Sequence, residues 1–436
     1  MKILYFELRK EFIRKSFFFM MIILVIINFF WLEWDYHTNG GFTEDYVKVN
    51  ASEKENKYYE ELHQYLDGKL NAEKVSYVSE EYQRYHNLVS GDYSTEYDSS
   101  MHTGYAFGDY SLLTVHFYNP IKYLITYKEL NDGLLEKAEE NIRFFSDKNN
   151  KYEVEKNSFI LEHYKNRNPL YFYETGGWKH LLSYDKSDLF ILVLLIVGII
   201  PTFSKEKKNA MEIIQITSAY GRKLYIPIKL IAHIFVAVWL ELLFGIINYV
   251  VIHMQYGLSG TKMMLYSINE YRYTPLNISV IEFYLLEVLS KCIGFAIIAV
   301  ILTMIARLIK NTYAAFIAMI GYTSVFLYFS GFNSGITFVE NVLTLISPFS
   351  LLKLGELATS LKEIKFCGHF MTFHSFLYGV QATLIVILLC TMLVMSSLGN
   401  SLKMQQKNRP YKRIQQVGEK NVHFKIVQGN FPEKRA

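Results

Sequence analysis

Residues 16–32 read SFFFMMIILVIINFFWL, seventeen consecutive positions without a charged side chain. A helix needs roughly 20 such residues to cross the hydrocarbon of a bilayer, which is about 30 Å thick. The second apolar stretch of the chain is short, so we expect either that residues 181–187 lengthen it or that its helix tilts little. The sequence therefore predicts an all-α polytopic membrane protein embedded in the lipid bilayer. Its six transmembrane helices are expected at residues 16–32, 189–203, 226–252, 280–306, 313–332 and 373–398.

Basic residues gather on one side of these spans if successive spans alternate in direction. Short cytoplasmic loops carry an excess of Lys and Arg, whereas long translocated segments escape this rule. Residues 1–15, the connection after the second span and the tail at 402–436 are basic, and the turn after the fourth span carries Arg307 and Lys310. We therefore predict cytoplasmic termini and an extracytoplasmic domain at residues 33–188.

The charges of the chain are divided unevenly between these regions. Residues 33–188 hold 28 acidic and 17 basic residues, a net charge of −11, and the remaining residues carry +15, which together give the formal +4. Topology accounts for this asymmetry, so we expect no binding to nucleic acid. The tail, with nine basic and two acidic residues from residue 403 onward, suits either attraction to the membrane surface or docking of another protein.

Residues 1–15 place Ile3, Leu4, Phe6, Leu8 and Phe12 among charged residues. This pattern favours an interfacial helix that lies along the cytoplasmic leaflet. A simple cytoplasmic extension of the first span is the alternative.

The extracytoplasmic domain contains none of the three cysteines, so its own core must hold it together. Residues 44–88, 131–150 and 154–166 have helical patterns, and residues 91–109 read as a loop. Residues 111–127 suit a strand or a buried helix. We predict a mostly helical domain, with α+β as the alternative. Its histidines lack the i, i+4 spacing of a helical zinc site, so no metal site is predicted.

Motifs of catalysis and nucleotide binding do not occur in the sequence. There is no H-E-x-x-H, residues 331–335 read GFNSG rather than G-x-S-x-G, and no G-x-x-x-x-G-K-[ST] is found. We therefore expect neither an enzyme nor a nucleotide site in this chain.

The most specific local pattern lies in the connection at residues 205–221, between the second and third spans. A charged turn leads into a short helix, which Gly221 is expected to end before the next span. This helix would expose Met211, Ile214 and Thr217 on one face, so it needs the membrane surface or another protein to cover them.

Four features are similar to those of a known family: this connection, the six-span layout, the basic N-terminal helix and the segment ISPF at residues 346–349. In these features the chain resembles the permeases of type 2 ABC exporters, the ABC-2 family. The long insert departs from compact members, although some members carry one. The resemblance implies that residues 206–219 are a coupling helix that docks in a separate ABC ATPase subunit. The ATPase-coupling residues would be Glu206, Met211, Glu212, Ile214, Thr217, Gly221 and Arg222.

The same resemblance implies the partners and the site of ATP hydrolysis. Two ATPase copies would join this chain and a second copy of it, or a paralogue, in a bacterial plasma membrane. No cofactor would bind directly, because ATP and Mg would bind to the partner ATPase. Residues 336–361 would form short helices that dip back from the outer face, and Pro348 breaks the apolar run there.

Charged residues inside spans are costly and usually face a bundle interior or a polar cavity. Glu241, Glu287, Lys291 and His233 are therefore the candidates for a translocation pathway. Glu287 precedes Lys291 by four residues, which also suits a structural ion pair on one helix face. Glu241 has no evident partner in its own span, so it suits either a pathway role or a contact with a second copy. His233 lies two turns earlier, roughly on the same side.

We therefore predict the permease subunit of an ATP-driven exporter that works by alternating access. A peptide or amphipathic toxin is the first substrate that the resemblance suggests, and drug, lipid, glycan or sodium export stay open. The alternative is a non-transporting membrane sensor coupled to an ATPase. A stand-alone receptor or anchor is the third possibility.

Overall fold

Six helices of the computed structural model are long and apolar enough to cross a membrane. The structure describes residues 2–38, 51–91, 97–100, 102–169, 171–208, 221–309, 311–330, 337–392 and 394. The helices and their apolar lengths agree with the predicted all-α polytopic membrane protein. The six candidate spans are Lys15–Thr38, Gly176–Phe203, Tyr225–Tyr256, Val280–Leu308, Thr312–Phe329 and Phe373–Met392.

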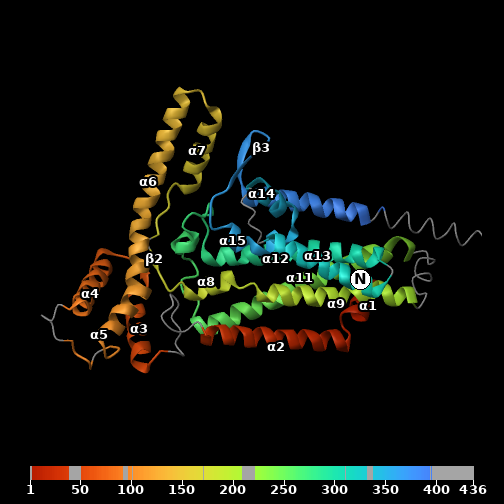
Figure 1. Ribbon diagram of the computed structural model, residues 1–436, viewed down its shortest axis with the longest axis horizontal. Helices are drawn as coiled ribbons and strands as arrows, with labels where there is room; N and C mark the ends of the chain where they lie inside the picture. The colour runs from red at the N-terminus through yellow and green to blue at the C-terminus, as the bar shows by residue number, and fades with distance from the viewer. Residues whose placement is uncertain are drawn as a thin grey trace, which may run out of the picture.

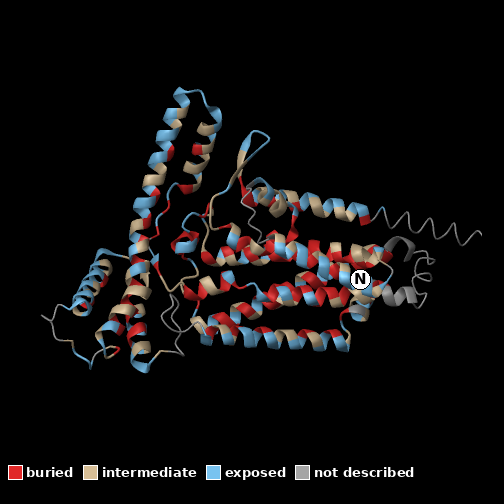
Figure 2. Cartoon of the chain, in the orientation of Figure 1, coloured by how far each residue is buried: buried red, intermediate tan, exposed pale blue. Residues whose placement is uncertain are grey.

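The spanning helices form a bundle in which three are central and three peripheral. The central ones are α9 (Lys186–Lys208), α11 (Gly221–Tyr256) and α12 (Val280–Leu308). In the candidate spans that contain them, 61%, 50% and 67% of the most apolar stretch is buried. The peripheral helices α2 (Lys15–Thr38), α13 (Thr312–Ser330) and the last helix bury 22%, 17% and 17%. Figure 2 shows the same contrast in colour. The peripheral helices therefore offer broad apolar faces to lipid or to a second chain.

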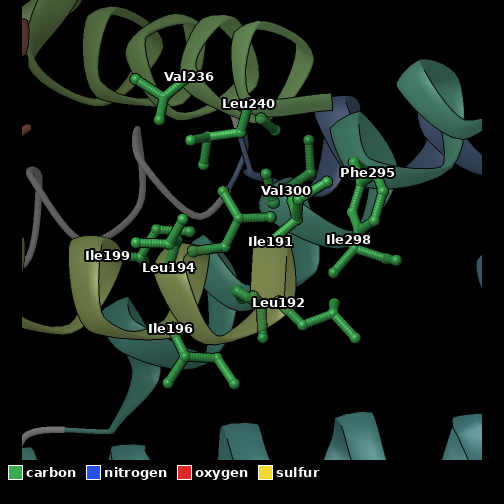
Figure 3. Close-up of a cluster of buried hydrophobic side chains, with 14 of the residues drawn as sticks. Ile191, Leu192, Leu194, Ile196, Ile199, Val236, Leu240, Phe295, Ile298 and Val300 are labelled. Atoms are coloured by element: carbon green, nitrogen blue, oxygen red, sulfur yellow. The ribbon is translucent and has the colours of Figure 1, made fainter. Parts of the chain in front are cut away.

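Close packing of apolar side chains joins the central helices. Ile191 and Leu194 of α9, Leu240 of α11, and Phe295 and Ile298 of α12 belong to one buried cluster (Figure 3). Lipid tails are as apolar as these side chains, so within a bilayer this cluster stabilises the bundle through van der Waals contact. The cluster fills the middle of the bundle.

The segment α8 (Gly176–Ser183) leads directly into α9, and the two together form the second candidate span. This agrees with the expected extension of the short apolar stretch by residues 181–187. Trp178 of α8 is fully buried and donates a hydrogen bond from Nε1 to the carbonyl oxygen of Ser259, at 2.7 Å. The entry to the bundle is therefore fixed to the connection between α11 and α12.

A helical domain, here called the head, lies across one end of the bundle (Figure 1). The predicted helix at 44–88 is two helices in its described part, and residues 111–127 are helical rather than a strand. The head consists of α3 (Glu53–Leu66), β1 (Gly68–Lys69), α4 (Ala72–Ser90), α5 (Ala106–Leu113), the π-helix η2 (Thr114–Tyr118), α6 (Asn119–Asp147), α7 (Lys151–Tyr164) and β2 (Tyr171–Phe172). The strand β1, in the turn between α3 and α4, pairs with β2 in an antiparallel ladder.

Local sequence signals start the helices of the head. Ser52 and Glu55 form a capping box at α3, and the side chains of Asn71 and Asn150 accept from the first turns of α4 and α7. A buried core of tyrosine, leucine and phenylalanine then packs these helices together. Its largest fully buried members include Tyr85 and Phe117.

Backbone-directed hydrogen bonds attach the head to the connection between α11 and α12. This connection contains the short 3-10 helices η3 (Leu265–Ser267) and η4 (Asn269–Tyr271). The hydroxyl of Tyr123 in α6 donates to the carbonyl oxygen of Tyr266 at 2.7 Å, and that of Tyr164 in α7 donates to Tyr273 at 2.6 Å. These contacts place α6 and α7 directly against the bundle.

A bent pair of helices precedes the last span. It comprises α14 (Thr337–Ile346), then η5 (Pro348–Lys353) with α15 (Leu354–Leu357), and the two halves meet at 96°. Gln381 of the last helix donates to the carbonyl oxygens of Leu345 and Ser347 at the bend, at 2.7 and 3.1 Å. The carbonyl oxygen of Ser347 also accepts from the backbone amide of Ser350 at 3.2 Å. The fold here agrees with the expected short helices around Pro348.

Two elements near the ends of the bundle complete the fold. A hairpin of β3 (Glu363–Phe366) and β4 (His369–Thr372) reaches the head, where Lys156 lies 2.8 Å from Glu363. At the opposite end, α1 (Lys2–Glu11) packs against α9 and α11 and is separated from α2 by a turn (Figure 1). This hairpin was not predicted from the sequence.

Candidate functional site

Four buried charged residues meet among the three central helices. Asp188 comes from the first turn of α9, Glu241 from α11, and Glu287 and Lys291 from α12. None is more than 7% exposed. The Nζ atom of Lys291 lies 3.3 Å from Oδ2 of Asp188 and 3.8 Å from Oε1 of Glu287. One ammonium thus holds two carboxylates, a pairing that buried charges require.

The sequence predicted part of this arrangement. The i, i+4 contact of Glu287 with Lys291 is as expected from their spacing. Asp188 was instead assigned to the end of the extracytoplasmic domain. The helix α9 begins two residues earlier, at Lys186, and this turns the Asp188 carboxylate into the bundle. An acidic residue directly before an apolar run was the signal that could have indicated it.

Glu241 lines a small cavity beside these ion pairs, together with Glu287 and Lys291. It therefore has charged neighbours inside its own chain, contrary to its isolation in the sequence. The cavity measures about 20 Å³, which is room for one water molecule. Ser187, Asn248 and Tyr284 also line it, so polar groups surround its contents.

A chain of hydrogen bonds runs along the wall of this cavity. Asn248 donates to Oγ of Ser187 at 3.0 Å and accepts at Oδ1 from Asn28 of α2 at 2.8 Å. The hydroxyl of Tyr184, between α8 and α9, donates to Asn28 at 2.9 Å. Such bonds between spanning helices contribute about 0.6 kcal/mol each. This network also ties the peripheral helix α2 to the centre of the bundle.

His233 belongs to a second buried site, separate from the charged cluster. Its Nδ1 lies 2.7 Å from Oγ1 of Thr303, and Thr202 is 3.5 Å from Nε2. Eight residues of α11 separate it from Glu241, a rise of about 12 Å. Val236, Ala237 and Leu240, which come between the two along α11, belong to the buried apolar cluster. The four predicted pathway residues thus divide into two sites.

A third buried ion pair fixes α1. Nζ of Lys229, a fully buried residue of α11, lies 3.0 Å from Oε2 of Glu7. The rings of Tyr225 and Phe203 face the same ammonium, with centroids at 5.3 and 5.6 Å. Sequence reasoning missed this pair, because Lys229 was counted among the topogenic basic residues.

The predicted ATPase-coupling residues fall largely outside the described residues. Met211, Glu212, Ile214 and Thr217 lie within residues 209–220, which the structure does not describe. The backbones at Glu206, Gly221 and Arg222 are helical, at the end of α9 and the start of α11, and their side chains are also outside the description. The coupling helix therefore stays a prediction.

A second polar site lies in the head, around His63 of α3. Its Nδ1 is 2.7 Å from Asp67 and its Nε2 is 3.3 Å from Glu174, which also accepts from the Tyr59 hydroxyl. Burial lowers the pKa of His63, but Asp67 and Glu174 outweigh it and raise the pKa to about 9. For Glu174 burial acts in the opposite direction and raises the pKa. The contact with His63 outweighs burial and lowers the pKa of Glu174 to about 2. Both groups are charged at neutral pH.

Next to Glu174 a cavity of about 210 Å³ opens between the head and the bundle. The π-helix η2, the start of α6, the segment after β2, α8 and the α11–α12 connection contribute its walls. Irregular π turns are frequent at functional sites. The cavity is thus a place where a ligand would touch both parts of the molecule.

No family model, curated protein or solved structure matches this chain. The resemblance to ABC-2 permeases rests on the sequence features alone.

Proposed function

We propose that this chain is the membrane-spanning permease subunit of an ATP-driven ABC exporter. A separate ATPase, in two copies, would supply ATP hydrolysis, and a second permease or a paralogue would complete the transporter. The bent helix pair before the last span is the observation that carries this proposal. The resemblance leads us to expect a re-entrant segment at that place, and proline and Gln381 together make such a break tolerable inside a bilayer.

The connectivity of the bundle supports a mechanical role for residues 205–221. This segment joins α9 to α11, which carry Asp188 and Glu241 of the charged cluster and line the buried core. A push from a docked ATPase would therefore reach the central helices directly. The pair of Glu7 with Lys229 would transmit part of that motion to α1. Shifts of packed helices of this kind change access from one side of a membrane to the other.

The substrate proposal is a peptide or an amphipathic toxin, and it rests on the resemblance alone. The head, on the outer face of a bacterial plasma membrane, would recognise the substrate or shield its exit. Its cavity of about 210 Å³ at the junction with the bundle suits a contact with part of such a molecule. The chain would be a transport subunit rather than an enzyme.

A membrane sensor coupled to an ATPase is the second candidate. Two observations favour it. The charged cluster and His233 form separate buried sites within the described part of the chain, with Val236, Ala237 and Leu240 of the apolar cluster between them along α11, and the junction cavity offers a ligand site. In this function the head would bind a ligand and the bundle would transmit force without passing a substrate.

Co-purification with the ATPase encoded beside the gene tests the exporter proposal. The double change Met211→Asp, Ile214→Asp places charges on the apolar face of the predicted coupling helix and should reduce recovery of the ATPase at least tenfold. The matched control Phe107→Asp, Leu130→Asp alters two exposed apolar residues of the head and should leave recovery unchanged. Equal recovery with both variants, while the chain remains monodisperse in detergent, would reject the coupling helix.

A further inference from the structure

The charged cluster contains more carboxylates than it can hold as ions. Asp188, Glu241 and Glu287 face a single cation, Lys291. With every group ionised, the cluster would carry a net charge of −2 in an environment that solvates charge poorly. Isolated charges there are expensive, and buried carboxyl groups commonly lose their charge by protonation.

The hydrogen bonds and ion pairs show which carboxylate oxygens have no partner among the described residues. Lys291 contacts both oxygens of Asp188, at 3.3 and 3.4 Å, so this carboxylate is fully engaged. In contrast, Oε2 of Glu287 is buried without a hydrogen-bond partner. Glu241, 4% exposed, makes no hydrogen bond or ion pair with any residue that the structure describes. Both side chains face the cavity of about 20 Å³.

We propose that Glu241 and Glu287 form a proton-binding site, in which one exchangeable proton is held on either carboxyl group and bridges to the other directly or through the water that the cavity can hold. The reaction is simple proton uptake: an O–H bond forms on one carboxylate oxygen, and the charge of the cluster falls from −2 to −1. The proton gives the unpartnered oxygens the hydrogen bond that they lack.

A proton suits this site better than a metal cation. The Lys291 ammonium lies 3.8 Å from Glu287, and it would repel a metal ion held between the same carboxylates. The cavity has room for one water-sized particle, whereas a metal ion needs several oxygen ligands. Within the described ranges no group of three His, Cys, Asp or Glu residues is arranged to hold a metal ion.

Polar and charged side chains surround the proposed site on every side that the structure describes. From α9 and the turn before it, Asp188, Ser187 and Tyr184 face the cluster; from α11, Asn248 does; and from α12, Tyr284 and Lys291. The charges of Asp185 and Lys353, which lie farther from the cavity, act electrostatically on Asp188. Hydrogen bonds through Asn28 join Tyr184 to Asn248, and Asn248 to Ser187, so the polar wall of the cavity is held in place.

This inference requires the bundle and its burial but no ATPase, so it stands or fails apart from the proposed function. Infrared spectra of the whole chain in lipid nanodiscs, at neutral pH, measure protonated carboxyl groups directly. Wild type should show their carbonyl band, and Glu241→Gln or Glu287→Gln should remove it. The control Glu162→Gln changes an exposed carboxylate of the head and should leave the band intact. A wild-type band that persists in both cluster variants, or no such band, would overturn the proposal.

Two further arms use the same samples. Replacing all sodium by potassium should leave the band unchanged, and a sodium-dependent loss would instead identify a metal-cation site and overturn the proton assignment. Thermal unfolding gives the second arm, because the folded chain binds a proton that the unfolded chain releases near neutral pH. Wild type should lose stability relative to the glutamine variants as pH rises, and parallel curves would contradict the proposal.

Discussion

At the scale of single residues, burial decides which charged side chains matter. Lys291 and Lys229 are both at least nine-tenths buried, and each touches a carboxylate from another helix. The sequence predicted the partner that is four residues away, Glu287. It could not predict Asp188 or Glu7, because those contacts depend on where α9 begins and on how α1 packs.

Lys291→Met should strongly destabilise the bundle. The change leaves Asp188 and Glu287 buried without their cation, and removing one partner of a buried ion pair costs about 3–5 kcal/mol. Thermal unfolding in detergent should show a markedly lower midpoint, and adding Asp188→Asn should restore part of it. As a control, Lys262→Met removes an exposed lysine of the α11–α12 connection and should have little effect. A Lys291→Met midpoint equal to that of wild type would show that the pair contributes nothing.

The pair of His63 with Glu174 predicts a pH dependence for the head. The raised pKa of His63 means that its contribution is complete below pH 6.5 and is lost as pH rises through about 9. The lowered pKa of Glu174 means that its contribution is present above pH 4.5 and is lost as pH falls through about 2. A raised pKa of this size corresponds to about 3 kcal/mol.

Unfolding of the head, followed by tyrosine fluorescence, should therefore show highest stability between pH 4.5 and 6.5 as far as this pair is concerned. His63→Gln should remove the decline toward pH 9 and leave the acid limb partly in place. A variant whose curve parallels that of wild type from pH 6.5 to 9 would rule out His63 as the source.

At the scale of elements, periodicity and apolar length predicted the spans, and long-range contacts determined the rest. The stretch at 16–32 grew into α2, which continues to Thr38, because the residues after the apolar run also suit a helix. The β3–β4 hairpin was missed since its position depends on ion pairs with α7, including Lys365 with Glu155 at 2.5 Å. The π turn η2 likewise leaves no mark in the hydrophobic pattern.

Gln381→Leu should loosen the bent helix pair. It removes one of the two donors to the carbonyl oxygen of Ser347 and the donor to that of Leu345. A buried carbonyl left without a partner, as that of Leu345 would be, costs about 1–3 kcal/mol. The control Thr383→Leu lies on the same helix with an exposed side chain. Limited proteolysis should cut Gln381→Leu faster than wild type around residues 337–357, with no change in the control. Equal cutting rates would mean that the bend is held by packing alone.

At the scale of the whole molecule, charge asymmetry and the large insert predicted a bundle with one sizeable domain, and the head at one end of the bundle agrees with that layout (Figure 1). Which spans are central could not be predicted, because all six are strongly apolar. The burial contrast between α12 and α13 arises only from packing. The division of the predicted pathway residues into two sites has the same origin, since His233 contacts Thr303 whereas Glu241 lines the cavity beside Lys291.

We propose that a separate ATPase drives this bundle through residues 205–221. The rate of ATP hydrolysis in proteoliposomes that contain the ATPase alone, or the ATPase with this chain, tests that proposal. We expect the chain to change the rate and Met211→Asp, Ile214→Asp to return it to that of the ATPase alone, whereas Phe107→Asp, Leu130→Asp should behave as wild type. One identical rate in all four preparations would contradict it.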